Sequence, residues 1–194
     1  MTRIVLLVLA IFLLIAAYAA SPFLGLYRII SAVQTRDVST LSERVDFRHL
    51  RQSLTSQIIE TYLKVTGRTA RLGQFGTMAI GVGAAIADPM VSQIVSPQGL
   101  IALFESGRVN IGPQSVAVQL GPLSSSSIGS FWDAVRNSDY GLARFFISLP
   151  TSAAPQEQFR LELQVLEWQW KLSAINLPEQ LRVGLATELA KQYP

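Results

Sequence analysis

The chain begins with an apolar run that covers residues 4–20 and contains no charged side chain. Arg3 stands directly before this run, and Pro22, Phe23 and Leu24 follow it. The run has about the minimum length for a membrane-spanning helix, roughly 17–25 residues. The pattern therefore divides the chain into an apolar N-terminal segment, residues 1–22, and a body formed by residues 23–194.

Two interpretations of residues 1–22 are open. In the first, the helix is an uncleaved membrane anchor that continues through Leu26 and Ile30. In the second, it is a secretory signal peptide, because Ala17-Tyr18-Ala19 fits the A-x-A cleavage pattern. We favour the anchor. Arg3 and the terminal amine would then stay in the cytoplasm, which leaves the body outside the inner membrane with residues 4–20 in contact with its lipid.

The first half of the body has helical periodicity. Apolar residues recur every three or four positions in two stretches, which comprise Phe23, Leu26, Tyr27, Ile30 and Val33, and then Phe47, Leu50, Leu54, Ile58 and Tyr62. Asp37 could cap the second helix, but Thr40-Leu41-Ser42-Glu43 also has the capping-box pattern. Gly67 is expected to end that helix.

The middle of the chain is rich in small residues and turn signals. Residues 74–95 mix Met78 and other apolar side chains with glycine and alanine, which predicts a buried or lid-like helix. Pro97 is expected to open a short helix. We expect a flexible loop near residues 107–129, with a short edge strand where Val116, Val118 and Leu120 alternate.

The last third is expected to form an antiparallel sheet. Apolar residues alternate with polar ones from Phe145 to Leu149 and from Phe159 to Val165. A reversal at Leu166-Glu167 would place Trp168 and Trp170 on one face of the next strand. Ile175 and Leu177 fall out of phase with them, and a bulge near Ser173 would bring them back into phase. Residues 131–135 fit a strand or a helix, and Pro178 opens a final helix. The predicted fold is α+β, with a helical first half packed on this sheet.

Composition changes this interpretation only slightly. The net charge is +3, from 16 Lys and Arg against 13 Asp and Glu, which is too small for a typical nucleic-acid-binding protein. Residues 25–80 hold eight basic and four acidic side chains. This excess could meet anionic lipid headgroups or form solvated helix faces, and we favour solvated faces. The absence of cysteine excludes disulfides, thiol nucleophiles and iron–sulfur sites.

Candidate catalytic groups are few. His49 is the only histidine, and no Gly-x-Ser-x-Gly turn accompanies it. Asp133 and Glu162 could perform acid–base chemistry if they lay in an apolar cavity. No pattern indicates a metal site, a nucleotide site or another cofactor, so we do not expect an enzyme.

An apolar ligand site is the remaining candidate. Trp168 and Trp170 would line it, with Phe145 from the neighbouring strand and Met78 from the small-residue segment. The alternative, which we favour, is that these side chains fill the core between sheet and helices.

The chain resembles a bacterial envelope family catalogued as domain of unknown function 2939. The resemblance is carried by Tyr18-Ala19-Ala20-Ser21-Pro22, Leu26-Tyr27, Ala32-Val33, Arg36-Asp37 and Val45-Asp46-Phe47-x-x-Leu50-Arg51-x-Ser53-Leu54, and by Trp170-Lys171-Leu172 and Asn176-Leu177-Pro178 near the end. It implies a proteobacterial protein with an N-terminal membrane helix and supplies no catalytic residues. The helical front and closing sheet are also similar, at the level of fold, to the nuclear-transport-factor-2-like cone.

These observations predict a membrane-anchored, non-catalytic binding or interaction domain that faces the periplasm. Its partner would be a protein or an apolar ligand. One alternative is a secreted periplasmic carrier of lipid or another small apolar ligand. A second alternative is a carboxylate-dependent enzyme that uses Asp133 or Glu162.

Overall fold

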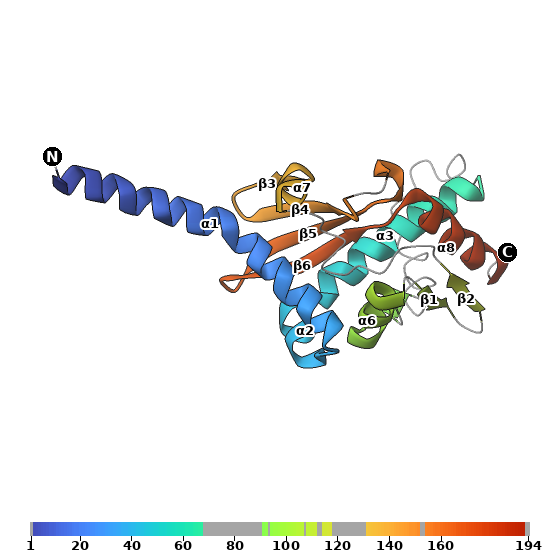
Figure 1. The fold of residues 1–194 in the computed structure, drawn as a ribbon. Helices are drawn as coiled ribbons and strands as arrows, with labels where there is room; N and C mark the ends of the chain where they lie inside the picture. The colour runs from blue at the N-terminus through green and yellow to red at the C-terminus, as the bar shows by residue number, and fades with distance from the viewer. Residues whose placement is uncertain are drawn as a thin grey trace.

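The computed structural model describes residues 2–67, 91–92, 94–106, 108–111, 114–117, 131–151 and 154–192. Helices cover one face and one edge of a four-stranded antiparallel sheet with the order β3-β4-β5-β6, which confirms the α+β prediction (Figure 1). The elements are α1 (Thr2–Gln34), α2 (Val38–Arg44), α3 (Phe47–Val65), α6 (Pro97–Ser106), β1 (Arg108–Ile111), β2 (Gln114–Ala117), α7 (Phe131–Arg136), β3 (Ser138–Tyr140), β4 (Arg144–Leu149), η3 (Pro155–Glu157), β5 (Phe159–Leu166), β6 (Gln169–Asn176) and α8 (Glu179–Gln192).

Two aspartates begin the second and third helices. Asp37 accepts a hydrogen bond from the backbone N–H of Thr40 at 3.0 Å, so it caps α2 and the alternative start at Thr40 is wrong. Asp46 accepts from the backbone N–H of His49 at 3.1 Å and caps α3 in the same way. At the other end of α3, Gly67 has a φ of 65°, a conformation that glycine adopts without steric cost.

The hairpin of β5 and β6 contains the predicted bulge. Glu162 pairs with Ala174 and Leu163 pairs with Leu172, so Ser173 is the extra residue between two registers. The bulge shifts the alternation of β6 by one position, and both Leu172 and Ile175 are therefore buried.

The free edge of β6 is covered by the chain around α3. Val45 forms a parallel bridge with Leu172, and the Asp46 N–H donates to the Leu172 carbonyl at 2.8 Å. Farther along, Gln57 of α3 donates from Nε2 to the Ile175 carbonyl at 2.8 Å, and its Oε1 accepts from the Leu177 N–H at 3.0 Å. These bonds satisfy backbone groups that an exposed edge strand would leave open to other chains.

One hydrophobic core joins the helices to the sheet. The second half of α1, the inner face of α3, α6 and α8 all contribute buried side chains to one core, which also contains the apolar side chains of β4, β5 and β6. The stripe predicted for α3 is confirmed at Leu50, Leu54 and Ile58. The opposite sheet face carries polar side chains, among them Glu162 and Gln164.

Other predictions have mixed outcomes. The helices at Pro97 and after Pro178 are confirmed, and residues 131–136 are helical. Within the loop expected near 107–129, β2 overlaps the start of the predicted edge strand at Val116, and it pairs with β1, which was not predicted. Strand β3, which has only three residues, was not predicted. The small-residue segment, apart from residues 91–92 and 94–95, lies outside the described residues.

Candidate functional site

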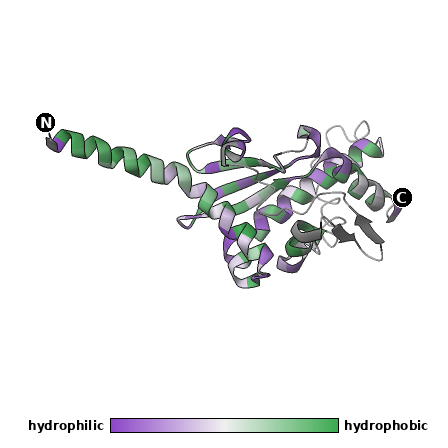
Figure 2. Ribbon diagram, viewed as in Figure 1, coloured by the Kyte–Doolittle hydropathy of each residue, from purple (hydrophilic) through white to green (hydrophobic). Residues whose placement is uncertain are grey.

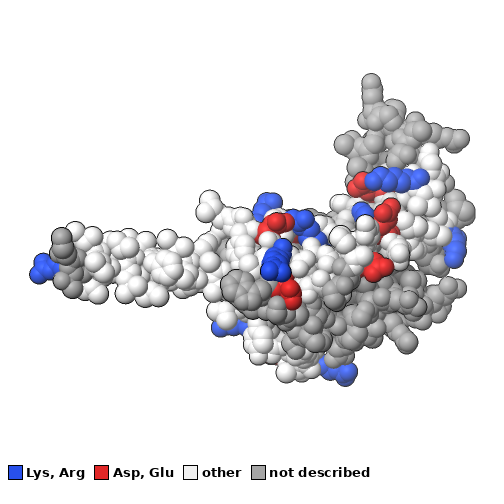
Figure 3. All heavy atoms as spheres, turned by 45° about the horizontal axis from the view of Figure 1, so that its top comes forward, with Lys and Arg blue, Asp and Glu red and all other residues white. Residues whose placement is uncertain are grey.

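Helix α1 is one continuous helix whose first half is exposed and whose second half is buried in the body. It projects from the body (Figure 1), and its first half carries an uninterrupted apolar surface without charge after Arg3 (Figures 2 and 3). The large apolar side chains from Ile4 to Ile15 are 48–71% exposed, whereas Leu26, Ile29 and Val33 are at most 3% exposed. Within the described residues, α1 is the one helix long and apolar enough to cross a membrane or serve as a signal sequence.

A proline marks the point where α1 reaches the body. Pro22 lacks the N–H that would bond the carbonyl of Tyr18 one turn earlier. The Ser21 hydroxyl donates to that carbonyl instead, at 2.7 Å. Ser21 Oγ also accepts from the indole Nε1 of Trp170, at 2.7 Å. The Ser21 hydroxyl therefore bonds the carbonyl that Pro22 leaves without its helical partner, and it also connects α1 to β6.

The next turn of α1 approaches β6 closely. A Cβ at Gly25 would lie 2.7 Å from the Cβ of Trp170, shorter than any real contact between such atoms. Only glycine permits this approach of helix and strand. Ser21 and Gly25 lie on adjacent turns of the same helix face, so together they hold the indole of Trp170 against α1.

Four aromatic rings pack around this contact. Phe145 lies at the centre, with ring centroids 5.0 Å from Phe23, 5.0 Å from Tyr140 and 6.5 Å from Trp170. Burial raises the pKa of the Tyr140 phenol, and a hydrogen bond with Ser138 opposes that shift. The phenol also donates to the carbonyl of Ala19 at 3.3 Å, so β3 contacts α1 as well.

The predicted ligand-site residues are therefore only partly brought together. Phe145 and Trp170 share the aromatic cluster, and Met78 lies outside the described residues. Two apolar cavities among the described core residues, one beneath α1 and one beneath α8, measure about 20 and 10 Å³. Each has room for about one water molecule, so neither accommodates a lipid.

The predicted common face of Trp168 and Trp170 is wrong. The hairpin turn lies one residue later than expected, at Glu167 and Trp168, which have φ angles of 52° and 61°. Trp168 therefore precedes β6 and is 98% exposed, whereas Trp170 is 8% exposed. Two successive residues with positive φ are typical of the tight turns that fit a twisted hairpin, where asparagine and glycine are preferred. Neither residue marked the turn in the sequence.

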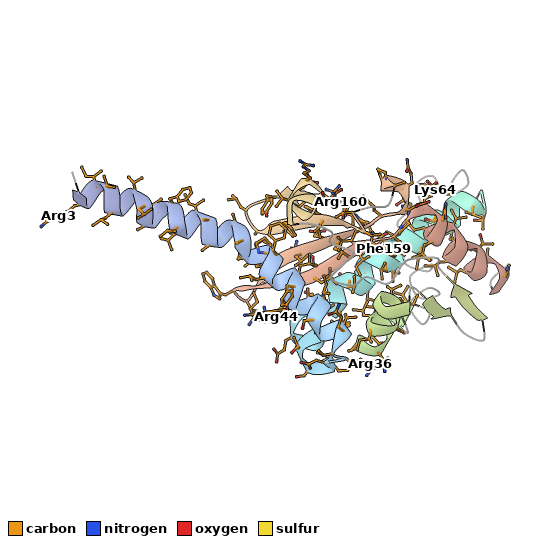
Figure 4. The ribbon with its side chains drawn as sticks, viewed as in Figure 1. Arg3, Arg36, Arg44, Lys64, Phe159 and Arg160 are labelled. Atoms are coloured by element: carbon orange, nitrogen blue, oxygen red, sulfur yellow. The ribbon has the colours of Figure 1, made fainter. Side chains whose placement is uncertain are left out.

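Trp168 and Trp170 instead border a surface hollow of about 290 Å³ between α1 and the β5–β6 hairpin. The other lining residues are Ser21, Leu24, Gly25, Arg28, Arg44 and Gln169. Arg44 lies beside α1 at the end of the body from which that helix projects (Figure 4). None of the eight lining residues is acidic. We call this feature the arginine hollow.

A second hollow, of about 350 Å³, lies where α3 meets the polar face of the sheet. It brings together His49 and Glu162, two residues considered for catalysis, whereas Asp133 does not line it. His49 Nδ1 lies 2.7 Å from Oδ2 of Asp46, and Glu162 lies 3.7 Å from the Nε of Arg144. The remaining lining residues are Gln52, Ser53, Ser56, Gln164, Ser173 and Ala174.

In this region, the pKa of the Asp46 carboxyl is shifted from its ordinary value. Desolvation raises the pKa of its carboxyl, but hydrogen bonds from the backbone and ring of His49 and the charge of that ring outweigh it, so the net pKa is lowered. Among the residues that the structure describes, no group of three His, Asp or Glu side chains is arranged to hold a metal ion.

Sequence reasoning did not single out Ser21, Gly25, Arg28 and Arg44 as functional candidates. A signal existed for the first two, because a serine followed by a proline and then a glycine interrupts an otherwise apolar helix. Arg28 and Arg44 were considered only as part of the basic excess of residues 25–80, and nothing in the sequence paired them, because they come from different helices.

Comparisons with known proteins identify one family. The family model described as "Protein of unknown function (DUF2939)" matches residues 11–103, which include α1 from Ile11 onward and all of α2 and α3. No curated protein and no solved structure matches the chain. The likeness to the nuclear-transport-factor-2-like cone therefore stays a prediction. The match over residues 11–103 supports the family resemblance that the sequence motifs indicated, and the chain is similar to DUF2939 proteins over that segment.

Proposed function

We propose that this protein is a single-pass anchored protein of the bacterial inner membrane, with an α+β domain that faces the periplasm and binds partners without catalysing a reaction. One observation carries the proposal. The same helix, α1, is apolar and exposed in its first half and part of the hydrophobic core in its second half.

The contacts around residues 17–22 favour an uncleaved anchor over a signal peptide. The hydroxyl of Tyr18 donates to the carbonyl of Leu142, in the turn between β3 and β4. The carbonyl of Ala19 accepts from Tyr140. Cleavage after Ala19 would remove both contacts and leave Ser21 at a frayed helix end. The body contacts residues on both sides of the cleavage pattern, and only an uncleaved chain keeps all of these contacts.

The polar flanks support the orientation. Arg3 precedes the apolar run, and short basic segments tend to stay on the cytoplasmic side. The folded body then lies in the periplasm, where the absence of cysteine also removes any problem of unwanted disulfides.

A binding role suits the surface better than catalysis or transport. Glu162 is already engaged by Arg144, and Asp133 does not line the polar hollow with it. The small apolar cavities give no support to a lipid carrier. The structure thus favours an anchored domain that presents its outer surface to partners.

The cysteine-free chain makes the topology directly testable. Ser39→Cys places a unique thiol at an exposed position on the body, and Thr2→Cys places one before the anchor. In intact bacterial spheroplasts, a membrane-impermeant maleimide should label Ser39→Cys but label Thr2→Cys only after permeabilisation. The reverse pattern would overturn the orientation.

The anchor has its own test. We expect the full chain to stay in the membrane fraction after an alkaline carbonate wash and to keep residues 1–19 in its intact mass. Release of a shorter chain into the soluble fraction would favour the secreted carrier, and a co-purified lipid would strengthen that alternative.

A further inference from the structure

We propose that the arginine hollow binds the phosphate headgroup of an anionic phospholipid from the bilayer that holds α1. The proposal rests on the membrane anchor argued above and adds a specific ligand class to it. It places Arg28 and Arg44 against the phosphate and Trp168 in the interfacial layer beside it.

The depth of the hollow follows from helix geometry. A hydrocarbon core about 30 Å thick needs about 20 helical residues, so a span that begins at Ile4 ends near Phe23. Arg28 follows five residues later, about 7.5 Å farther along the axis. The headgroup layer on each side of the core is about 5–8 Å thick. Arg28 therefore lies at the level of the lipid phosphates.

At this depth the turn between β3 and β4 reaches into the outer part of the hydrocarbon core, because it contacts Tyr18 and Ala19, about one turn before the end of the span. Leu142 in that turn is 91% exposed. Leu24 and Tyr27 on α1 are also largely exposed, one turn before Arg28 or less. Apolar and aromatic side chains thus surround α1 where the bilayer surface is expected.

The charges suit a phosphate. Among the residues that the structure describes, Arg28 and Arg44 have no acidic partner and no carboxylate lines the hollow. Guanidinium groups bind phosphate oxygens with paired, charge-assisted hydrogen bonds. At about 290 Å³, the hollow is near the lower end of the range for small-ligand sites, about 300–1,000 Å³.

Trp168 points to the same conclusion by a separate route. Its positive φ is unfavourable for a bulky side chain, and its side chain is almost fully exposed to solvent. The fold gains little from a tryptophan at this position, where glycine would relieve the strain. Strained residues that do not serve packing tend to serve function. Tryptophan is the residue most suited to the membrane interface, where its ring can be apolar on one side and hydrogen-bonded on the other.

The lipid site can be measured on the full chain in mild non-ionic detergent micelles. Native mass spectrometry would compare the retention of phosphatidylglycerol and phosphatidylcholine. We expect phosphatidylglycerol to be retained more strongly. Each arginine near an anionic surface strengthens binding about five-fold, so Arg28→Gln with Arg44→Gln should weaken phosphatidylglycerol binding roughly thirty-fold. Binding of phosphatidylcholine should change little.

The control changes the net charge equally elsewhere. Arg48→Gln with Arg136→Gln removes two exposed arginines that do not line the hollow. A loss of phosphatidylglycerol as large as that of the first pair would overturn the site and indicate only general attraction. Thermal melts of both pairs would show that the fold is intact, because none of the four side chains is buried.

Trp168→Gly provides a second variant that should fold at least as well as the natural chain. In vesicles of phosphatidylglycerol with lipids brominated near the headgroup end of the acyl chain, the fluorescence difference between the natural chain and Trp168→Gly reports on Trp168. We expect strong quenching by these lipids and weak quenching by lipids brominated near the chain end. If neither brominated lipid quenched the fluorescence of Trp168, or if both quenched it equally, the interfacial position of Trp168 would be overturned. Failure of the anchor itself is seen separately, as release by carbonate.

Discussion

Replacing Gly25 with alanine tests the contact that joins α1 to the sheet. In an open helix, this change would stabilise the protein by about 1 kcal/mol, because glycine is a poor helix former. At position 25, the new Cβ would lie 2.7 Å from the Cβ of Trp170, whereas ordinary contacts begin at 3.4 Å. The two atoms must therefore separate by about 0.7 Å, and neither belongs to a flexible side-chain end.

The steric cost should exceed the gain in helix propensity. Overpacking a tight contact typically costs about 1–3 kcal/mol. Moving Trp170 away from α1 also weakens its 2.7 Å hydrogen bond to Ser21, which contributes about 0.5–1.5 kcal/mol. After subtracting the helix gain, we expect Gly25→Ala to lower the free energy of unfolding by about 0.5–3.5 kcal/mol. For a body of this size, each kcal/mol corresponds to about 2–4 °C in Tm.

Gly184 in α8 is the matched control. A Cβ there meets no atom within 4 Å, so Gly184→Ala should raise Tm by roughly 2–4 °C. The assay is thermal unfolding of the full chain in detergent micelles, followed by near-ultraviolet circular dichroism of the aromatic side chains. If both variants raised Tm by similar amounts, the close approach of α1 to Trp170 would be refuted.

Three further predictions concern the capped helix, the covered sheet edge and the projecting helix. The pKa of Asp46 is lowered on folding, so its charge stabilises the protein fully above the ordinary value of 3.8, and this contribution is lost as the pH falls through the folded pKa. In urea unfolding, the advantage of the natural chain over Asp46→Asn should therefore be present at pH 7 and shrink as the pH falls below 3.8. Gln57→Leu leaves a buried backbone carbonyl and a buried N–H of the sheet edge unpaired and should cost about 2–4 kcal/mol in the same assay, whereas Gln52→Leu on the exposed face of α3 should cost little; equal effects would contradict the edge contact. Leu13→Asp adds about 3–4 kcal/mol to the free energy of membrane insertion and should move the chain from the carbonate-resistant fraction into the soluble fraction, unlike Leu13→Ala; unchanged retention would argue against a spanning helix.

Much of the fold was predictable from local patterns. The stripe at Leu50, Leu54 and Ile58, the alternation along β5 and the bulge at Ser173 follow from one rule. Apolar positions that are buried on one face of a helix or strand must recur at the period of that element. The short elements were harder, because β3 and α7 contain too few residues for a period to be recognised.

The turn at Glu167 and Trp168 shows why the candidate site was only half predicted. Alternation places Trp168 in phase with Trp170, but Trp168 belongs to the hairpin turn and therefore does not lie in the sheet. Positive φ angles at residues other than glycine or asparagine have no signature in the sequence. The exposure of Trp168 depends on that turn, and its role at a surface could not be inferred before the turn was located.

The sequence by itself determined that residues 4–20 are apolar and uncharged, and that helices precede an antiparallel sheet. Only the tertiary structure decided that α1 continues from this segment into the core, and that Ser21, Gly25 and Trp170 meet. Ser21 and Trp170 are 149 positions apart. Hydrophobic periodicity reports which side of an element is buried, but the partner that buries it is selected by packing across the whole chain. For the same reason, Arg28 and Arg44 became a pair only when their two helices were placed beside the β5–β6 hairpin.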